Sequence, residues 1–300
     1  IDFDGVVGGT TPLGAVTINS VATLDADNVF KAASFTQGTG SVLTQFDGTV
    51  TLSGNFDFAG QALTLNALLD SDGTVAVTNA GTFTTAAAGD INADLGFTQN
   101  GTGTSSLAGD ITTTNSDIEF ATNVALTGPV LLDTASNDFG GDVTLVGAVS
   151  TDSNALTVNA GASGNVVMAN AANDFDVLLT VTGNEITVED INALETQITA
   201  LGDVDLKAGD TLTVGGSVMG QGSDLLLTSA FDIVFDELKV SGQLLAVTQG
   251  NSIDGGVTQK ASTGLSVIGT STFTADAGAN QVAVLTSASN DFVGAVTFDN

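Results

Sequence analysis

The sequence predicts an all-β protein built of stacked coils, a β-solenoid with roughly 15 coils of about 20 residues each. Three observations lead to this fold class. A motif at residues 135–145 recurs at residues 288–298 and, in a degenerate form, at residues 171–180. Short runs of alternating apolar and polar residues fill the chain between glycine-containing turns. A longer internal period relates segments far apart in the sequence. A unit that recurs in this way indicates an architectural repeat before it indicates a chemical site.

The short alternating runs are typical of strands with one buried and one solvated face. Clear examples are residues 50–52, 62–65, 155–158 and 211–214. β-Branched side chains dominate these runs, which favours strands over helices. Residues 188–198 have apolar side chains at helical spacing, but strand-like neighbours on both sides favour a strand and a corner there.

The longer period gives the size of the coil. Residues 35–37 match residues 97–99, and residues 56–59 match residues 118–121, in both cases at an offset of 62. This offset divides into three coils of roughly 20 residues, which is the size of one turn of a β-solenoid. No linker interrupts the chain, so we expect residues 1–300 to form one continuous solenoid segment. The last motif opens a new repeat just before Asn300, so we also expect the segment to belong to a longer repetitive chain.

The repeated motif has a predicted role for each residue. Phe139 should point inward and stack on phenylalanines of other coils. Asn137 should sit at a turn and hydrogen-bond to an adjacent coil, and Gly141 should adopt a backbone angle that other residues resist. Asp138 and Asp142 should face solvent or accept backbone N–H groups. The corresponding structural positions in the other copies are Asn173, Asp174, Phe175, Asn290, Asp291, Phe292 and Gly294.

The charge of the chain restricts its partners. There are 34 acidic residues against four lysines, no arginine and no histidine, and the net charge is −30. Such a chain repels nucleic-acid phosphates and anionic membrane surfaces, whereas cations are natural partners of its field. The absence of cysteine excludes disulfides and thiolate metal sites, and no apolar run is long enough to predict a membrane span.

Calcium is the one cofactor that the sequence suggests. Asp25 and Asp27, and likewise Asp70 and Asp72, place carboxylates two residues apart, as the first half of a calcium loop does. Neither segment completes a known calcium-loop pattern. Aspartate is also an ordinary turn residue, and this interpretation competes with the metal site.

Catalysis has weak support in the sequence. A glycosidase needs a pair of carboxylates, and Asp232 with Asp236, or Glu185 with Glu189, could supply one. A chain so rich in aspartate produces such pairs by chance, so we predict that the protein is not an enzyme. Carboxylates clustered in a groove would favour the opposite conclusion.

The repeats resemble those of filamentous-haemagglutinin-type exoproteins and other giant bacterial surface proteins. The similarity is carried by the motif at 135–144 and 288–297, by residues 7–14 and by residues 209–218. It covers essentially the whole chain, although the secretion domain of such exoproteins is not in this sequence. The resemblance implies a right-handed parallel β-helix, export from a bacterial cell, and a role as stalk, fibre or adhesin.

The predicted function is therefore structural: an extracellular or cell-surface solenoid that forms a stalk, fibre or filament, by self-association of coils or strands and with cations as stabilising partners. The alternative is an adhesin that binds a surface glycan or another cell-surface partner through a solenoid face or loop.

Overall fold

The computed structural model describes residues 1–40, 42–135, 139–249, 256–275 and 283–299. The chain divides into two compact units, unit 1 (residues 1–161) and unit 2 (residues 162–300). Both are parallel β-solenoids with no helix among the described residues, and they contain about 13 turns in all. The predicted fold class is confirmed, with a coil count close to the expected one. Continuity of the coil between the units stays a prediction.

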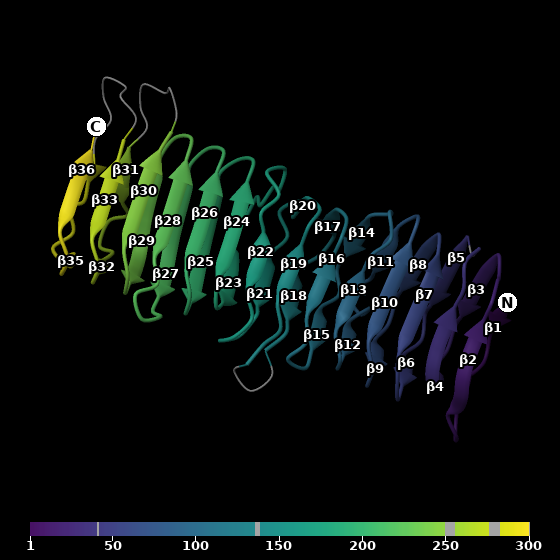
Figure 1. Ribbon diagram of the computed structural model, residues 1–300. Helices are drawn as coiled ribbons and strands as arrows, with labels where there is room; N and C mark the ends of the chain where they lie inside the picture. The colour runs from purple at the N-terminus through teal and green to yellow at the C-terminus, as the bar shows by residue number, and fades with distance from the viewer. Residues whose placement is uncertain (41, 136–138, 250–255, 276–282, 300) are drawn as a thin grey trace. The chain divides into compact units, whose positions relative to one another are not determined.

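Unit 1 is built from coils of three short strands, which stack into three parallel columns (Figure 1). The first column contains β1 (Asp2–Phe3), β3 (Thr23–Ala26), β5 (Leu43–Phe46), β8 (Ala62–Leu65), β11 (Phe83–Thr85), β14 (Ser105–Leu107), β17 (Val124–Leu126) and β20 (Val149–Ser150). The second contains β6 (Val50–Leu52), β9 (Leu69–Ser71), β12 (Ile91–Ala93), β15 (Ile111–Thr113), β18 (Val130–Asp133) and β21 (Leu156–Asn159). The third contains β7 (Phe56–Gly60), β10 (Val75–Asn79), β13 (Phe97–Gln99), β16 (Ile118–Phe120) and β19 (Val143–Leu145). β2 (Leu13–Ile18) pairs with the long β4 (Phe30–Gln37), which pairs in turn with both β6 and β7.

Unit 2 changes to coils of two longer strands. One column contains β22 (Val166–Met168), β24 (Ile186–Asp190), β26 (Val204–Ala208), β28 (Leu225–Ser229), β30 (Leu244–Thr248), β33 (Ser271–Thr274) and β36 (Val296–Asp299). The other contains β23 (Leu179–Gly183), β25 (Leu194–Ala200), β27 (Leu212–Val218) and β29 (Ile233–Val240). β29 then pairs with both β31 (Val257–Gln259) and β32 (Leu265–Val267), which are followed by β34 (Ala283–Val284) and β35 (Asp291–Phe292).

The register confirms the period that the sequence predicts. Phe35 pairs with Phe56, Phe56 with Val75, and Val75 with Phe97, so an offset of 62 corresponds to three coils. Coil length varies more than expected. Paired residues are 17 positions apart at Leu179 and Thr196 but 27 apart at Leu244 and Ser271, because the corners differ in length. The ambiguous segment 188–198 lies in strands β24 and β25, as predicted.

Within each unit the core is an interior column of apolar side chains. In unit 1 the rings of Phe35 and Phe56 stack with their centroids 5.1 Å apart, and Phe46 packs edge-on against both. Along each strand, every residue that points into the core is followed by one that points outward. This alternation gives the burial patterns of β12 and β25. Strand pairing and core packing both depend on the neighbouring coil, so each coil is stabilised by the next.

The prediction for Phe139 is wrong. Its side chain is 64% exposed, whereas Phe175, at the same position of the degenerate copy at residues 171–180, is 2% exposed. The corner around Phe139 packs backbone against backbone: a Cβ on Gly140 would lie 1.9 Å from the carbonyl oxygen of Ala160. With the backbone so close there is no space for an inward ring, and Thr134 is buried nearby and donates a hydrogen bond to the Gly141 carbonyl.

Glycine in the motif is also required for a different reason than predicted. Neither Gly141 nor Gly294 has a positive φ. A Cβ on Gly141 would lie 2.3 Å from the carbonyl carbon of Ser116, and one on Gly294 would lie 2.1 Å from the carbonyl oxygen of Gly269. Close approach of adjacent coils at the corner therefore excludes a side chain at both positions.

Candidate functional site

The corners of both units are joined by side chains that accept hydrogen bonds from the next coil. Asp90 Oδ1 accepts the N–H of Asp110 at 2.9 Å, and Asp203 Oδ1 accepts the N–H of Asp224 at the same distance. Each acceptor stands directly before the first buried residue of a strand. Further acceptor and donor residues in this arrangement are Asn55 and Thr74, Asp117 and Asp142, Asn123 and Ala148, Asn165 and Glu185, Asp224 and Gln243, and Asp232 and Gly256. We call these acceptors the corner ladder.

The corner ladder explains part of the acidic composition, because five of its acceptors are aspartates. A carboxylate accepts hydrogen bonds without offering a donor, so aspartate suits a position that faces a backbone N–H on the next coil. The sequence carried a signal for it, namely Asp or Asn immediately before an alternating apolar run. We predicted such hydrogen bonds only within the repeated motif, at Asn137, Asp138 and Asp142, and interpreted the aspartates elsewhere as turn residues.

Carboxylates from successive coils gather at one corner of unit 1. Oxygens of Asp25, Asp27 and Asp47 lie within 4.8 Å of one another, and so do oxygens of Asp2, Asp4 and Asp27. The Oδ1 atom of Asp25 is buried and has no hydrogen-bond partner among the described residues. Asp25 and Asp27, predicted as a calcium pair, are thus brought together, with partners from neighbouring coils in place of the rest of a calcium loop. Such oxygens could hold a hard divalent cation.

Two aspartates of this cluster, Asp2 and Asp27, have raised pKa values. The Asp4 carboxylate is the main cause of the raised pKa of Asp2. Partial desolvation, followed by the charge of Asp25, raises the pKa of Asp27. Protonation or a bound cation would relieve the same repulsion.

The second predicted calcium pair is not part of such a cluster in the described chain. Asp70 Oδ1 accepts a hydrogen bond from the Asn92 amide at 3.3 Å. Asp72 is exposed, and its backbone N–H donates to the Leu52 carbonyl. Both residues therefore serve strand and corner structure, which is the ordinary role of turn aspartates.

An open acidic groove of about 300 Å³ lies on unit 2, with Glu185, Asp203, Asp205 and Asp224 among its lining residues. Asp203 and Asp224 are corner-ladder acceptors. Burial, together with the charge of Glu189, raises the pKa of Asp205. Carboxylates clustered in a groove are the feature that would favour an enzyme, and they can also attract cations, but two of the four carboxylates here are committed to joining coils.

Three of the four carboxylates considered for catalysis are also engaged. Glu189 forms an ion pair with Lys207. Asp232 is a corner-ladder acceptor, and Asp236 forms an ion pair with Lys260 at 3.1 Å. The Lys260 hydrogen bond is the main cause of the lowered pKa of Asp236.

The degenerate copy of the motif at residues 171–180 packs against the buried carboxylate of Asp190 in unit 2. Asn173 is fully buried and donates to the carbonyls of Met168 and Glu189 at 2.8 and 2.9 Å. Asp190 is 2% exposed and accepts the N–H groups of Phe175 and Asn192. Burial raises the pKa of Asp190 to about 6, despite these two hydrogen bonds.

The remaining motif residues are placed as follows. The Asp174 carboxylate accepts from the Asn192 amide at 3.1 Å. Asn290 accepts the Leu265 N–H at 3.0 Å and exchanges amide hydrogen bonds with Gln259. Phe292 is half-buried against Phe273, and Asp291 is exposed. Asn137 and Asp138 lie outside the described residues.

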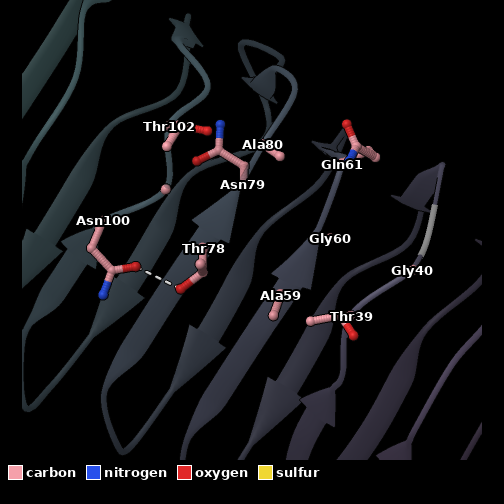
Figure 2. A pocket seen from close by; sticks show the side chains of 11 residues that line it. Thr39, Gly40, Ala59, Gly60, Gln61, Thr78, Asn79, Ala80, Asn100 and Thr102 are labelled. Atoms are coloured by element: carbon pink, nitrogen blue, oxygen red, sulfur yellow. Dashed lines mark hydrogen bonds between the residues drawn. The ribbon is translucent and has the colours of Figure 1, made fainter.

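A second groove, on unit 1, is free of charge (Figure 2). It has a volume of about 280 Å³ and is lined by the corners of four successive coils, at residues 39–40, 59–61, 78–80 and 100–102. Sequence reasoning did not find it, because its residues come together only when the corners stack.

Comparison with known proteins supports a repeat architecture. Residues 222–299 match a family model described as repeats of unknown function (DUF5649). No curated protein and no solved structure matches the chain. No helix in the described part of the chain is long and apolar enough to cross a bilayer. The match and the fold together identify a repeat β-solenoid protein.

Proposed function

We propose that this protein is an extracellular structural solenoid, a stalk, fibre or filament element of a bacterial cell surface. One observation carries the proposal: strand edges, core rings and corner carboxylates are all directed at the adjacent coil. The resemblance to filamentous-haemagglutinin-type exoproteins supports the location. In this proposal the protein has no catalytic role, and its function is length and resistance to unfolding.

Self-association follows from the same geometry. An open coil edge presents backbone groups in the register that another coil requires, so a second copy can supply the next coil. Negative-stain electron microscopy and analytical ultracentrifugation of the purified chain test the proposal. We expect elongated particles that join end to end as the concentration rises. Compact particles with a low frictional ratio would contradict it.

Cations belong to this proposal as stabilising partners. The net charge is −30, and acidic corner-ladder residues such as Asp203 and Asp224 stack on successive coils, so counterions reduce their repulsion. We expect the melting temperature to rise with NaCl, and to rise further with millimolar CaCl₂ at matched ionic strength. Equal melting temperatures at all these conditions would remove cations from the proposal.

An adhesin is the second candidate, and the uncharged groove on unit 1 favours it. A scaffold needs no recess of this kind, whereas a binding protein does. The two functions are compatible, because a surface fibre can carry a binding face along its side.

A further inference from the structure

We propose that the groove formed by residues 39–40, 59–61, 78–80 and 100–102 binds an uncharged oligosaccharide. This inference rests on the adhesin candidate and not on the structural role, so its failure would leave the proposed scaffold intact. It is argued from the chemistry, the unused hydrogen-bonding groups and the shape of the groove.

The chemistry of the lining excludes most ligand classes. No charged side chain lines this groove, although the protein has a net charge of −30. A cation would find no carboxylate in it, and the field of the protein repels an anion. The polar lining is made of hydroxyl and amide groups from Thr39, Gln61, Thr78, Asn100 and Thr102. Such groups complement a neutral ligand that is rich in hydroxyls.

Several of these groups are available to a ligand. Thr78 donates its hydroxyl hydrogen to Asn100 Oδ1, which leaves the Asn100 amide N–H groups without an acceptor in the described chain. The side chains of Thr39, Gln61 and Thr102 likewise form no hydrogen bond within the described residues. Asn79 differs, because its amide is buried and bonded to the Gly81 and Thr104 carbonyls. Figure 2 shows the unbonded side chains set around the groove on neighbouring corners.

The shape suits a chain of sugar units. The walls include Gly40, Ala59, Gly60, Ala80 and Gly101, whose small size lets a ligand approach the backbone closely. The groove crosses four coils, so an elongated ligand lying along it would meet hydroxyl or amide groups at more than one corner.

A peptide is a poorer fit for the same groove. Peptides that bind to β-structures usually add a strand to a free edge. Here the corner N–H groups are already used between coils: Ala80 donates to the Gly60 carbonyl at 2.8 Å, Gly81 to that of Gln61 at 2.7 Å, and Asn100 to that of Val77 at 3.0 Å. Side-chain hydrogen bonds to hydroxyls remain the available mode of recognition.

The test is a titration of the full chain with cellohexaose, maltohexaose and mannohexaose, followed by NMR of the side-chain amide signals of Gln61 and Asn100. We expect at least one of these sugars to shift both signals at about millimolar concentration. The Asn100→Ala and Thr102→Ala variants should each weaken binding about threefold to tenfold, the effect of one neutral hydrogen bond. Polygalacturonate, an anionic sugar chain, should not bind.

A matched pair of variants separates the groove from the general corner surface. Ala59 and Ala121 occupy equivalent corner positions, each directly after a paired core phenylalanine, and both are half-buried, but only Ala59 lines the groove. Ala59→Glu should abolish binding, and Ala121→Glu should leave it unchanged, with both variants folded by circular dichroism. The proposal is overturned if none of the three sugars binds at about 10 mM, if both glutamate variants lose binding equally, or if only a peptide library yields a ligand.

Discussion

Unit 1 stacks three short strands per coil around phenylalanine rings, whereas unit 2 stacks two longer strands around mainly aliphatic side chains. Strands such as β12 have three residues, and β27 has seven. Protein interiors must be filled to crystal-like density, so the two units achieve the same filling with side chains of different size and shape. The two units share the corner ladder, which shows that coil joining is independent of coil shape.

The largest effect is expected from a substitution that disrupts the aromatic core of unit 1. Phe35 is fully buried and packs against the rings of Phe30, Phe46 and Phe56. Phe35→Ala should lower the free energy of unfolding of unit 1 by about 3–5 kcal/mol, because it removes contacts and leaves a cavity. Hydrogen exchange, resolved by peptide, measures the loss in each unit separately.

A conservative pair of substitutions sharpens this comparison. Phe235 of unit 2 is equally buried, but among the described residues its ring contacts only that of Phe273, with the ring centroids 6.1 Å apart. Since each aromatic pair contributes about 0.5–1.5 kcal/mol beyond burial, Phe35→Leu should destabilise its unit more than Phe235→Leu. Equal losses would show that volume alone, and not ring packing, distinguishes the cores.

The second prediction uses the buried carboxylate of unit 2. The pKa of Asp190 is raised to about 6 from 3.8, so its ionised form is disfavoured in the folded state. Stability from this group is present at pH values below 3.8 and is lost as pH rises through 6. Unit 2 should therefore be more stable at pH 4 than at pH 7, by about 2 kcal/mol from Asp190 alone.

The Asp190→Asn variant isolates this contribution. It should reduce the pH dependence of unit 2 and leave that of unit 1 in the same molecule unchanged. The charges of Asp174 and Asp176 contribute to the raised pKa of Asp190, and the variant removes this repulsion as well. An unaltered pH profile of unit 2 would assign its titration to other groups.

The third prediction tests the corner ladder, which the two units share. Asp90 of unit 1 accepts the Asp110 N–H at 2.9 Å, and Asp224 of unit 2 accepts the Gln243 N–H at 2.7 Å. Replacing either by alanine should cost about 1–2 kcal/mol, because a backbone N–H loses its acceptor. Replacement by asparagine should cost less, since the acceptor remains and a negative charge is removed. Chemical denaturation of the four variants would contradict the corner ladder if alanine and asparagine behaved alike.

The sequence determines strands, period and burial alternation well, because these depend on residues close together in one strand. The offset of 62 between residues 35–37 and 97–99 was readable as a repeat of three coils, and the pairings of Phe35 with Phe56, Phe56 with Val75 and Val75 with Phe97 confirm it. The orientation of Phe139 could not be read from the sequence, because it depends on how closely the backbone of Ala160 approaches the corner at Gly140.

The candidate sites depend even more on stacking. Asp27 and Asp47 come together only because their coils are neighbours, and the uncharged groove combines four corners that are distant in sequence. Corner lengths set this alignment, and no local pattern encodes it. The sequence shows which residue types could form such sites, but it does not show which residues of other coils they meet.

The smallest expected effect concerns the exposed faces. Lys207 forms an ion pair with Glu189 on unit 2, and its side chain is 52% exposed. Lys207→Met should cost about 0.5 kcal/mol or less at low salt, because exposed ion pairs contribute little and are screened. Lys260 lies between Glu195 and Asp236, at 3.0 and 3.1 Å, so Lys260→Met should cost more by leaving two carboxylates without their cation.

Salt distinguishes a local ion pair from the field of the whole chain. If only the pairs matter, both lysine variants should approach the stability of the wild-type protein in about 1 M NaCl, where charges a few ångströms apart are screened. With a net charge of −30, each lost lysine also adds to long-range repulsion, which salt relieves at much lower concentration. Melting temperatures measured from low to high NaCl therefore separate the two effects. A deficit for Lys260→Met that persists at high salt would instead assign the role of this side chain to packing of its aliphatic stem.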